Sequence, residues 1–140
     1  MTSLLVNIDV DDLARAEAFY TGAFGLRTNR RFGDGALELL GAGVPLYLLR
    51  KPAGSLASAS AGDGSRRDYR RHWTPVHLDF VVDDLEAALE RAQAAGAVRE
   101  GEVRNEAWGR IALLADPFGH GLCVIQFHGR GYDEIATPAA

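Results

Sequence analysis

Apolar side chains alternate with polar ones in Leu4–Val10 and again, in the second half of the chain, in Pro75–Val82. A period of two is typical of a strand with one buried face, so both stretches are predicted to be strands whose apolar side packs on a helix. In the first strand this alternation puts Asn7 and Asp9 on the face away from that helix.

Each strand leads into a helical pattern through the same four residues, Val-Asp-Asp-Leu. The two copies are Val10–Leu13 and Val82–Leu85. Apolar residues then recur every three or four positions, which indicates an amphipathic helix. These positions are Leu13, Ala16, Tyr20 and Phe24 in the first copy, and Leu85, Leu89 and Ala92 in the second. Since a carboxylate before a helix accepts bonds from free backbone N–H groups, Asp11 or Asp12 is predicted to cap the first helix and Asp83 the second.

Three further strands are predicted after each helix, with turns between them. They are Arg27–Phe32, Ala36–Leu40 and Val44–Leu49 in the first half, and Arg99–Val103, Arg110–Ala115 and Gly121–Phe127 in the second. Each half thus has the order β-α-β-β-β, which predicts one α+β domain over residues 1–140. Its half-modules are residues 4–50 and 75–128. Residues 51–74 are rich in Gly, Ser and Ala and are interpreted as a flexible linker or lid.

The composition argues against several classes of protein. The chain has 140 residues, of which 47% are hydrophobic, and a net charge of −4. A nucleic-acid-binding domain usually has a basic face, so no nucleic-acid partner is expected. No apolar run approaches the ~20 residues of a membrane span, and no basic segment precedes an apolar run at the N-terminus, so we expect a cytoplasmic protein without a membrane partner. The single cysteine, Cys123, excludes an intrachain disulfide.

Two local motifs accompany the repeat: the aromatic pair Phe19-Tyr20 in the first helix, and Asp-Pro-Phe-Gly-His at residues 116–120, before the last strand. With these motifs and its two βαβββ units, the chain from Leu4 to Phe127 resembles the vicinal oxygen chelate superfamily, also called the glyoxalase/bleomycin resistance protein/dioxygenase family. The resemblance implies a glyoxalase-like fold with a curved mixed sheet from each half around a cavity. It also implies a homodimer.

Enzymes of this superfamily usually hold a divalent metal at four positions, one on the first strand and one on the last strand of each half. The resemblance carries these positions onto Leu5, Tyr47, His77 and Cys123. Only His77 is a good ligand for a hard metal, since Leu5 has no donor atom and Cys123 selects softer metals. Because a catalytic metal normally has about three protein ligands, no metal cofactor is predicted, and a divalent metal is the alternative.

The cavity between the two modules is predicted to bind a small organic ligand through an apolar, aromatic cleft with a few polar groups. The candidate ligand-binding residues are Asn7, Asp9, Tyr47, Trp73, His77, Asp79, Trp108 and Cys123. His77, Asp79 and Asp9 are also the catalytic candidates, because a partly desolvated imidazole or carboxylate can act as a base or hold a cation. Each of the three has a structural alternative, as a group hydrogen-bonded between strands.

Other candidates have ordinary explanations beside functional ones. The arginines of residues 66–71 either close over an anion or belong to a solvated loop. Trp73 and Trp108 either form flat walls for an aromatic ligand or pack beside the sheet. Cys123 is more typical of a small buried hydrophobe than of a nucleophile, and His120 is interpreted as structural.

The favoured hypothesis is a glyoxalase/bleomycin-resistance-like protein that binds its ligand without a catalytic metal, because bleomycin-resistance-type members of the superfamily sequester a compound. The alternative is an enzyme, namely a lyase, isomerase or dioxygenase that uses a His or Asp base or a metal, in one version with ligands from a second subunit. A third hypothesis is an accessory module whose dimer surface matters more than its cavity.

Overall fold

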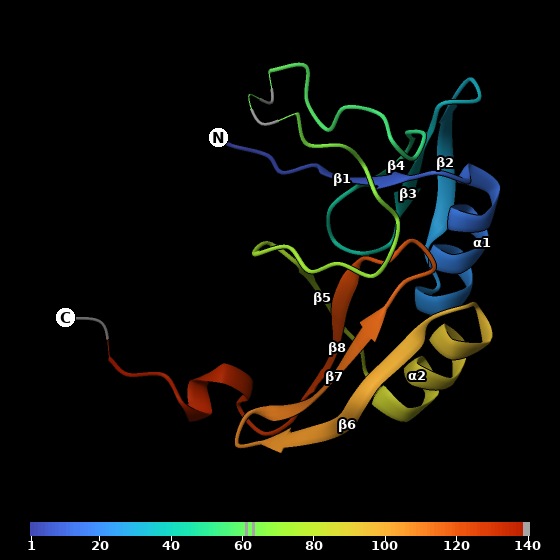
Figure 1. The fold of residues 1–140 in the computed structure, drawn as a ribbon. Helices are drawn as coiled ribbons and strands as arrows, with labels where there is room; N and C mark the ends of the chain where they lie inside the picture. The colour runs from blue at the N-terminus through green and yellow to red at the C-terminus, as the bar shows by residue number, and fades with distance from the viewer. Residues whose placement is uncertain (61, 63, 139–140) are drawn as a thin grey trace.

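A computed structural model describes residues 1–60, 62 and 64–138 and shows two βαβββ modules followed by a short 3-10 helix (Figure 1). The first module contains β1 (Val6–Val10), α1 (Leu13–Phe24), β2 (Arg27–Phe32), β3 (Ala36–Leu40) and β4 (Leu46–Arg50). The second contains β5 (Leu78–Val81), α2 (Leu85–Ala94), β6 (Val98–Glu106), β7 (Gly109–Ala115) and β8 (Gly121–Phe127). The 3-10 helix is η1 (Gly131–Glu134). The predicted α+β fold of two βαβββ modules is confirmed.

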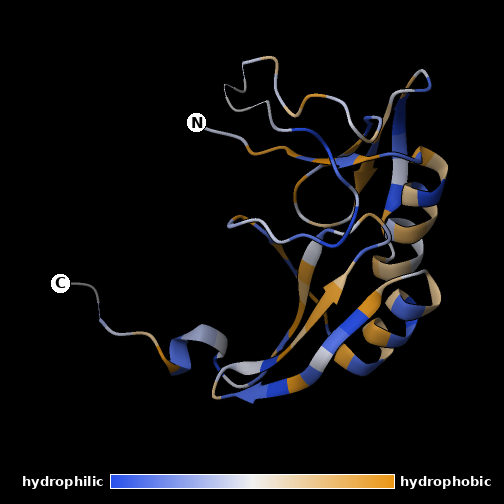
Figure 2. Ribbon diagram, in the orientation of Figure 1, coloured by the Kyte–Doolittle hydropathy of each residue, from blue (hydrophilic) through white to orange (hydrophobic). Residues whose placement is uncertain are grey.

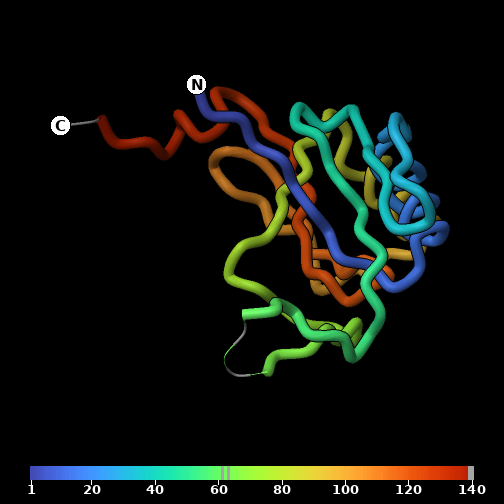
Figure 3. The backbone as a smooth tube through the Cα atoms, turned by 90° about the horizontal axis from the view of Figure 1, so that it is seen from above, coloured from blue at the N-terminus to red at the C-terminus, as the bar shows by residue number. Residues whose placement is uncertain are grey.

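Each module forms a four-stranded mixed sheet. The strand orders are β1-β4-β3-β2 and β5-β8-β7-β6, in which the first pair is parallel and the others are antiparallel. The helices α1 and α2 pack side by side and cover the same side of both sheets, and the opposite sheet faces, here called the open faces, point to the left in Figure 1. Both termini leave the molecule on this open side (Figures 1 and 3). Within the described part of the chain, no helix has the length and apolar character needed to cross a membrane.

The alternation in the sequence produces a core between the sheets and the helices. Val10, Leu48 and Val124 are strand residues of this core and have no exposed surface. Figure 2 shows the same division, because β7 and β8 are mainly hydrophobic while the outer strand β6 is mainly hydrophilic. The rings of Phe24 and Phe80 stack at 3.9 Å, so one core continues across the two modules.

Aspartate caps begin both helices. The side chain of Asp12 accepts a hydrogen bond from the backbone N–H of Arg15 at 3.0 Å, and that of Asp84 accepts one from Ala87 at 3.1 Å. The predicted cap of the second helix, Asp83, is therefore wrong by one position. The capping residue must directly precede the first helical residue and have an extended backbone, and Asp84 meets both conditions.

The turn at residues 116–120 joins the second module to the first. The Tyr20 hydroxyl donates to Asp116 Oδ2 at 2.6 Å, and Asp116 Oδ1 accepts from the backbone N–H of Phe118 at 2.8 Å. Tyr20 and Asp116 are only 1% and 4% exposed. Burial, and then the negative charge of Asp116, raise the pKa of Tyr20 well above its ordinary value, so the phenol remains a hydrogen-bond donor.

Residues 51–74, interpreted above as a linker, form a strap that connects β4 to β5 and has hydrogen bonds of its own. The Arg67 backbone N–H donates to the Ser55 carbonyl at 2.8 Å, so the strap folds back on itself. Near its end, the His72 N–H donates to the Gly119 carbonyl at 2.9 Å. The strap is the green segment at the bottom of Figure 3.

Both outer strands are bulged. In β2, the ladder against β3 shifts between Thr28 and Arg31, and in β6, the ladder against β7 shifts between Glu100 and Arg104. A bulge inserts residues that have no partner on the neighbouring strand, and it re-aims the side chains around it. The strand β6 is consequently longer than the one predicted from the sequence.

Candidate functional site

The open face of the second sheet brings several predicted site residues together. Directly opposed residues of neighbouring strands share a face. One row across β5, β8, β7 and β6 consists of Asp79, Cys123, Leu113 and Glu100. The next row consists of Val81, Ile125, Ile111 and Arg104. Phe80 and Val124 alternate with these positions and belong to the core, so both rows lie on the side away from α2.

His77, Asp79 and Cys123 form a cluster at one end of the first row. His77 Nε2 lies 3.2 Å from a carboxylate oxygen of Asp79, and ligand-type atoms of all three residues lie within 4.8 Å of one another. Cys123 is 7% exposed. Burial, and then the negative charge of Asp79, raise the pKa of the Cys123 thiol to about 11, so this thiol is protonated at neutral pH.

The same cluster is also a candidate metal centre. An imidazole nitrogen, a carboxylate oxygen and a sulfur are three possible ligands, the number typical of catalytic zinc with an open position. Asp79 was predicted as a ligand-binding residue and a base, and it becomes a possible metal ligand because β5 places it directly opposite Cys123. The other two carried-over positions add no ligand, since Leu5 is apolar and the Tyr47 hydroxyl is bound to Glu38.

Trp73 forms a wall beside this cluster. Its ring centroid lies 4.7 Å from that of His77, and the side chain is half exposed. The indole lies so close to Gly121 that a Cβ there would be 2.3 Å from a ring carbon. The Arg71 guanidinium lies 5.7 Å from the ring centroid. Because residue 121 is a glycine, the Trp73 ring, at the end of the strap, can pack against its backbone.

A cavity of about 670 Å³ lies next to Trp73, over the open face of the second sheet. Side chains that line it include Trp73, His77, Arg104, Ile111, Leu113 and Cys123. Its lining is mainly apolar with a few polar groups, as is typical of sites for small organic molecules. Two hollows between the modules are smaller, at about 320 and 340 Å³. The main candidate site therefore lies on the second module and the strap, whereas the predicted cavity lay between the modules.

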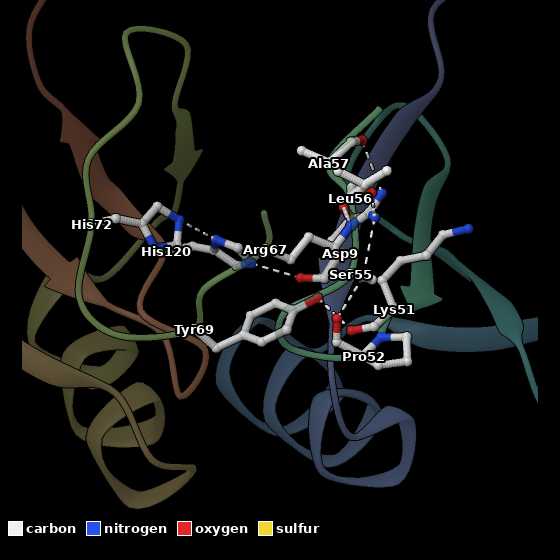
Figure 4. A network of polar contacts seen from close by, with 10 residues as sticks. All are labelled: Asp9, Lys51, Pro52, Ser55, Leu56, Ala57, Arg67, Tyr69, His72 and His120. Carbon is white, nitrogen blue, oxygen red and sulfur yellow. Dashed lines mark hydrogen bonds and ion pairs between the residues drawn. The ribbon is translucent and has the colours of Figure 1, made fainter. Parts of the chain in front are cut away.

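Asp9 is bound to the strap. Its carboxylate accepts a hydrogen bond from Arg67 Nε at 2.6 Å (Figure 4). The same guanidinium donates to Ser55 Oγ at 3.3 Å and to the carbonyl oxygens of Leu56 and Ala57. The Arg67 side chain is 16% exposed. A largely buried guanidinium with this many acceptors is an anchor, so Asp9 ties the strap to β1 and its charge is compensated.

Two histidines extend this network to the second module. His120 Nε2 lies 2.7 Å from the Asp9 carbonyl oxygen, and His120 Nδ1 lies 2.8 Å from His72 Nε2 (Figure 4). His72 Nδ1 lies 2.9 Å from the Arg70 carbonyl oxygen. His120 thus connects β1, the strap and the turn before β8, which agrees with its interpretation as a structural residue.

Tyr47 belongs to a separate cluster on the open face of the first sheet. Its hydroxyl donates to Glu38 at 2.6 Å, and the same carboxylate accepts from Arg30 at 2.6 and 3.0 Å and from Asn29 at 2.7 Å. Glu38 is 3% exposed. The bonds from Arg30, then Tyr47 and Asn29, lower the pKa of Glu38 to about 2. Glu38 is the one acidic residue in the otherwise apolar run 36–40, and this pattern was the sequence signal for a buried carboxylate.

Trp108 and Asn7 lie apart from the larger cavity. Trp108 is in the turn between β6 and β7 and packs against Phe127 and Tyr132, with ring centroids 6.0 and 5.1 Å away. Asn7 borders the hollow of about 340 Å³ between β1 and β5. The predicted residues that meet at one site are Trp73, His77, Asp79 and Cys123.

The sequence patterns did not identify the residues of the cavity floor, Ile111 and Leu113, or its cation, Arg104. Ile111 and Leu113 look like any other apolar strand residues in the sequence, and alternation alone does not say which face is left open. Arg104 reaches the cavity through the bulge in β6, and Gly101, within that bulge at φ 81°, was the only local signal.

Comparison with known proteins places the chain in a family. Residues 5–125 match a family model described as a glyoxalase-like domain, so the chain belongs to the glyoxalase-like domain family. An uncharacterized protein of Mycobacterium bovis is 29% identical to it over 119 residues, which are 84% of this chain and 78% of that protein.

Solved structures share the fold at low sequence identity. The fosfomycin resistance protein FosX from Listeria monocytogenes has a TM-score of 0.69 and 18% identity, and the match covers 97% of this chain and 99% of that one. Lactoylglutathione lyase from Agrobacterium tumefaciens has a TM-score of 0.60 and 20% identity, with 89% and 92% covered. With the family match, these likenesses confirm the predicted superfamily, and at such identities they speak for the fold alone.

Proposed function

We propose that the chain binds a small organic molecule in the cavity over the open face of the second sheet, and that binding needs no catalytic metal. The observation that carries this proposal is the mainly apolar cavity of about 670 Å³. Its volume falls within the range of ~300–1,000 Å³ that is usual for small-molecule sites. His77, which lies 3.2 Å from the Asp79 carboxylate, supplies a polar group at one end, and Trp73 supplies a flat wall.

A fragment screen followed by NMR tests this proposal. Aromatic and alicyclic fragments are expected to shift the methyl signals of Ile111 and Leu113 together. Leu113→Trp fills the cavity and abolishes binding. Leu49→Trp, on the open face of the first sheet, is the matched control and leaves binding unchanged. Fragments that bind Leu113→Trp as well as the parent protein would contradict the proposal.

A second candidate function, a metal-dependent lyase, isomerase or dioxygenase, is favoured by the cluster of His77, Asp79 and Cys123. A FosX variant from Listeria monocytogenes was solved with Mn(II) and 1S,2S-dihydroxypropylphosphonic acid. Here a cysteine sulfur among the ligands favours a softer ion such as Zn²⁺. When bound, such an ion polarises a carbonyl group or activates a water molecule.

Elemental analysis separates the two candidates. The metal-free proposal expects no stoichiometric metal in the purified protein and ligand affinities that are unchanged by a chelator. One tightly held equivalent of zinc, lost in both Cys123→Ser and His77→Gln, would establish the metal-dependent alternative instead. Asp83→Asn, an exposed carboxylate before α2, serves as the control variant and is expected to have no effect on metal content.

A homodimer is part of this proposal. The open side of the molecule exposes large apolar side chains, including Val76 and Val81, which are 83% and 59% exposed. Covering them with a second copy would remove apolar surface from water. Sedimentation velocity at micromolar concentration is expected to give twice the monomer mass, and a monomer at all concentrations would remove this part of the proposal.

A further inference from the structure

The bulge in β6 decides which charge lies beside the cavity floor. Glu100 lies opposite Leu113, and a regular strand would then place Glu102 opposite Ile111. The inserted residues give this position to Arg104 instead, and the Glu102 side chain is 96% exposed. Bulges next to binding sites commonly re-aim a side chain in this way. The bulge therefore places the cation of Arg104 opposite Ile111, whereas an unbulged strand would place the carboxylate of Glu102 there.

Arg104 supplies the cation of the cavity lining. Among residues 1–60, 62 and 64–138, no side chain forms an ion pair or hydrogen bond with its guanidinium. Its side chain lines the cavity together with Ile111 and Leu113. A guanidinium beside an apolar floor gains most from an anion that also displaces water from the floor.

The two glutamates that line the cavity, Glu100 and Glu102, are each paired with an arginine. Arg71 bonds the two carboxylate oxygens of Glu100, each at 2.6 Å. Arg99 Nη2 lies 3.3 Å from the exposed carboxylate of Glu102. The Asp79 carboxylate lies 3.2 Å from His77 Nε2, and Asp79 is not among the residues that line the cavity. Among the residues that line the cavity, the charge without a counter-ion is therefore that of Arg104.

The first module shows how an arginine from a bulged outer strand is satisfied. Arg30, within the bulge of β2, bonds Glu38 through two N–H groups, at 2.6 and 3.0 Å. Glu38 lies opposite Tyr47 in its ladder, as Leu113 lies opposite Cys123 in the second module. The second module therefore has Leu113, an apolar residue of the cavity floor, at the position where the first module has the carboxylate of Glu38.

Resting on the proposed function of this cavity, we infer that its ligand is a small aromatic or alicyclic carboxylic acid whose carboxylate pairs with Arg104. Two parallel N–H bonds from the guanidinium match a carboxylate, so the ligand replaces what Glu38 supplies in the first module. The apolar body of the acid covers Ile111 and Leu113 beside the Trp73 ring.

A pair of probes with equal shape and different charge tests this inference. The probes are 2-naphthoate and its neutral amide, 2-naphthamide. Binding is measured by fluorescence in Trp108→Phe, where Trp73 is the remaining tryptophan. Naphthoate is expected to bind about tenfold more tightly than naphthamide, as one charge-assisted pair at a partly exposed site allows. Arg104→Gln removes this preference and leaves naphthamide binding unchanged, whereas Arg27→Gln, an exposed arginine of the first module, keeps it.

A second variant supplies the missing carboxylate from within the protein. Leu113→Glu is expected to weaken naphthoate binding more than naphthamide binding, and Leu113→Gln, of equal size, affects both alike. Equal affinity of the two probes in the parent protein, or a preference that survives Arg104→Gln, overturns the inference and leaves the cavity as a neutral-ligand site. If neither probe binds nor shifts the Ile111 methyl signals, the proposed function fails together with the inference.

Discussion

Cys123 has the surroundings of an unreactive thiol. Burial, and then the nearby Asp79 charge, raise its pKa to about 11, so only a small fraction is thiolate at pH 8. Because the thiolate is the nucleophile, alkylation by iodoacetamide at pH 8 is expected to be roughly 100-fold slower than for an ordinary cysteine. The rate should rise as the pH approaches 11. Mass spectrometry measures it without ambiguity, because the chain has one cysteine.

The contribution of the Asp79 carboxylate to the raised pKa of Cys123 can be tested separately. Asp79→Asn removes the neighbouring negative charge and is expected to accelerate alkylation, while Asp83→Asn, an exposed aspartate before α2, is not. Rapid modification of the folded parent protein at pH 8 would show that the thiol is more accessible or more acidic than this geometry allows.

The hydroxyl of Tyr20 is the only side-chain donor that the described residues provide to Asp116 Oδ2. Tyr20→Phe leaves this oxygen buried and unsatisfied, so the free energy of unfolding is expected to fall by about 1.5–3 kcal/mol. Urea denaturation measures the change. Tyr132→Phe, an exposed tyrosine of η1, is the control, and a similar loss in both variants would contradict the assigned role of the buried bond.

At the scale of single residues, some side-chain positions could be predicted from the sequence and others could not. Asp79 was placed by strand alternation, which needs no knowledge of distant contacts, and Cys123 was placed by the resemblance to the superfamily. The pairing of Asp9 was not predictable, since its partner Arg67 is 58 positions away in an irregular segment. Arg104 was missed because the bulge shifts the register of β6 by two residues, which places Arg104 opposite Ile111 where a regular strand would place Glu102.

The strap is an element with an identifiable anchor. Arg67 holds Asp9 and three acceptors of the strap itself, so Arg67→Gln is expected to detach the strap from β1. Hydrogen exchange at the Ala57 and Arg67 amides, which are bonded within the strap, should then accelerate at least tenfold while core amides do not change.

The neighbouring arginine provides the control for this experiment. Arg66 is exposed and bonds the Gly54 carbonyl, so Arg66→Gln is expected to leave exchange in the strap nearly unchanged. If Arg67→Gln exchanges like Arg66→Gln, the strap is held by its backbone bonds and by the His72–His120 contact, and the anchor role of Arg67 is wrong.

Most helices and strands followed from local patterns. Hydrophobic period and turn residues were sufficient to find them, since both are local properties of the chain. The cap of α2 was misassigned because two adjacent aspartates offer the same chemistry, and backbone conformation chooses between them. The strap was interpreted from composition alone, and composition does not reveal that Arg67 bonds Asp9 on β1 or that Tyr69 bonds the Lys51 carbonyl at the start of the strap.

For the whole molecule, acid is expected to weaken the fold through Glu38. Its pKa is lowered from 4.5 to about 2 by Arg30, Tyr47 and Asn29. A carboxyl group with a depressed folded-state pKa stabilises the fold above its ordinary pKa, and this contribution is lost as the pH falls from about 4.5 toward 2. Urea midpoints should therefore fall over this window, and they should fall less in Glu38→Gln. An equal acid dependence in both proteins would show that other carboxylates dominate.

The overall fold was predictable because a repeat of known type constrains topology strongly, whereas the place of the cavity was not. The two modules share one design but differ on their open faces: the carboxylate of Glu38 lies opposite Tyr47 in the first, and the apolar Leu113 lies opposite Cys123 in the second. Such a difference depends on which side chains meet across strands, and register is a long-range property.

The contact between Tyr20 and Asp116 has a consequence for the ancestry of the chain. The matching helix position in the second half is Ala92, and the matching turn in the first half, Gly41-Ala42-Gly43, contains no acid. Neither half can therefore complete this buried bond with a copy of itself. The two duplicated segments have become complementary, non-interchangeable parts, and each now depends on being encoded beside the other.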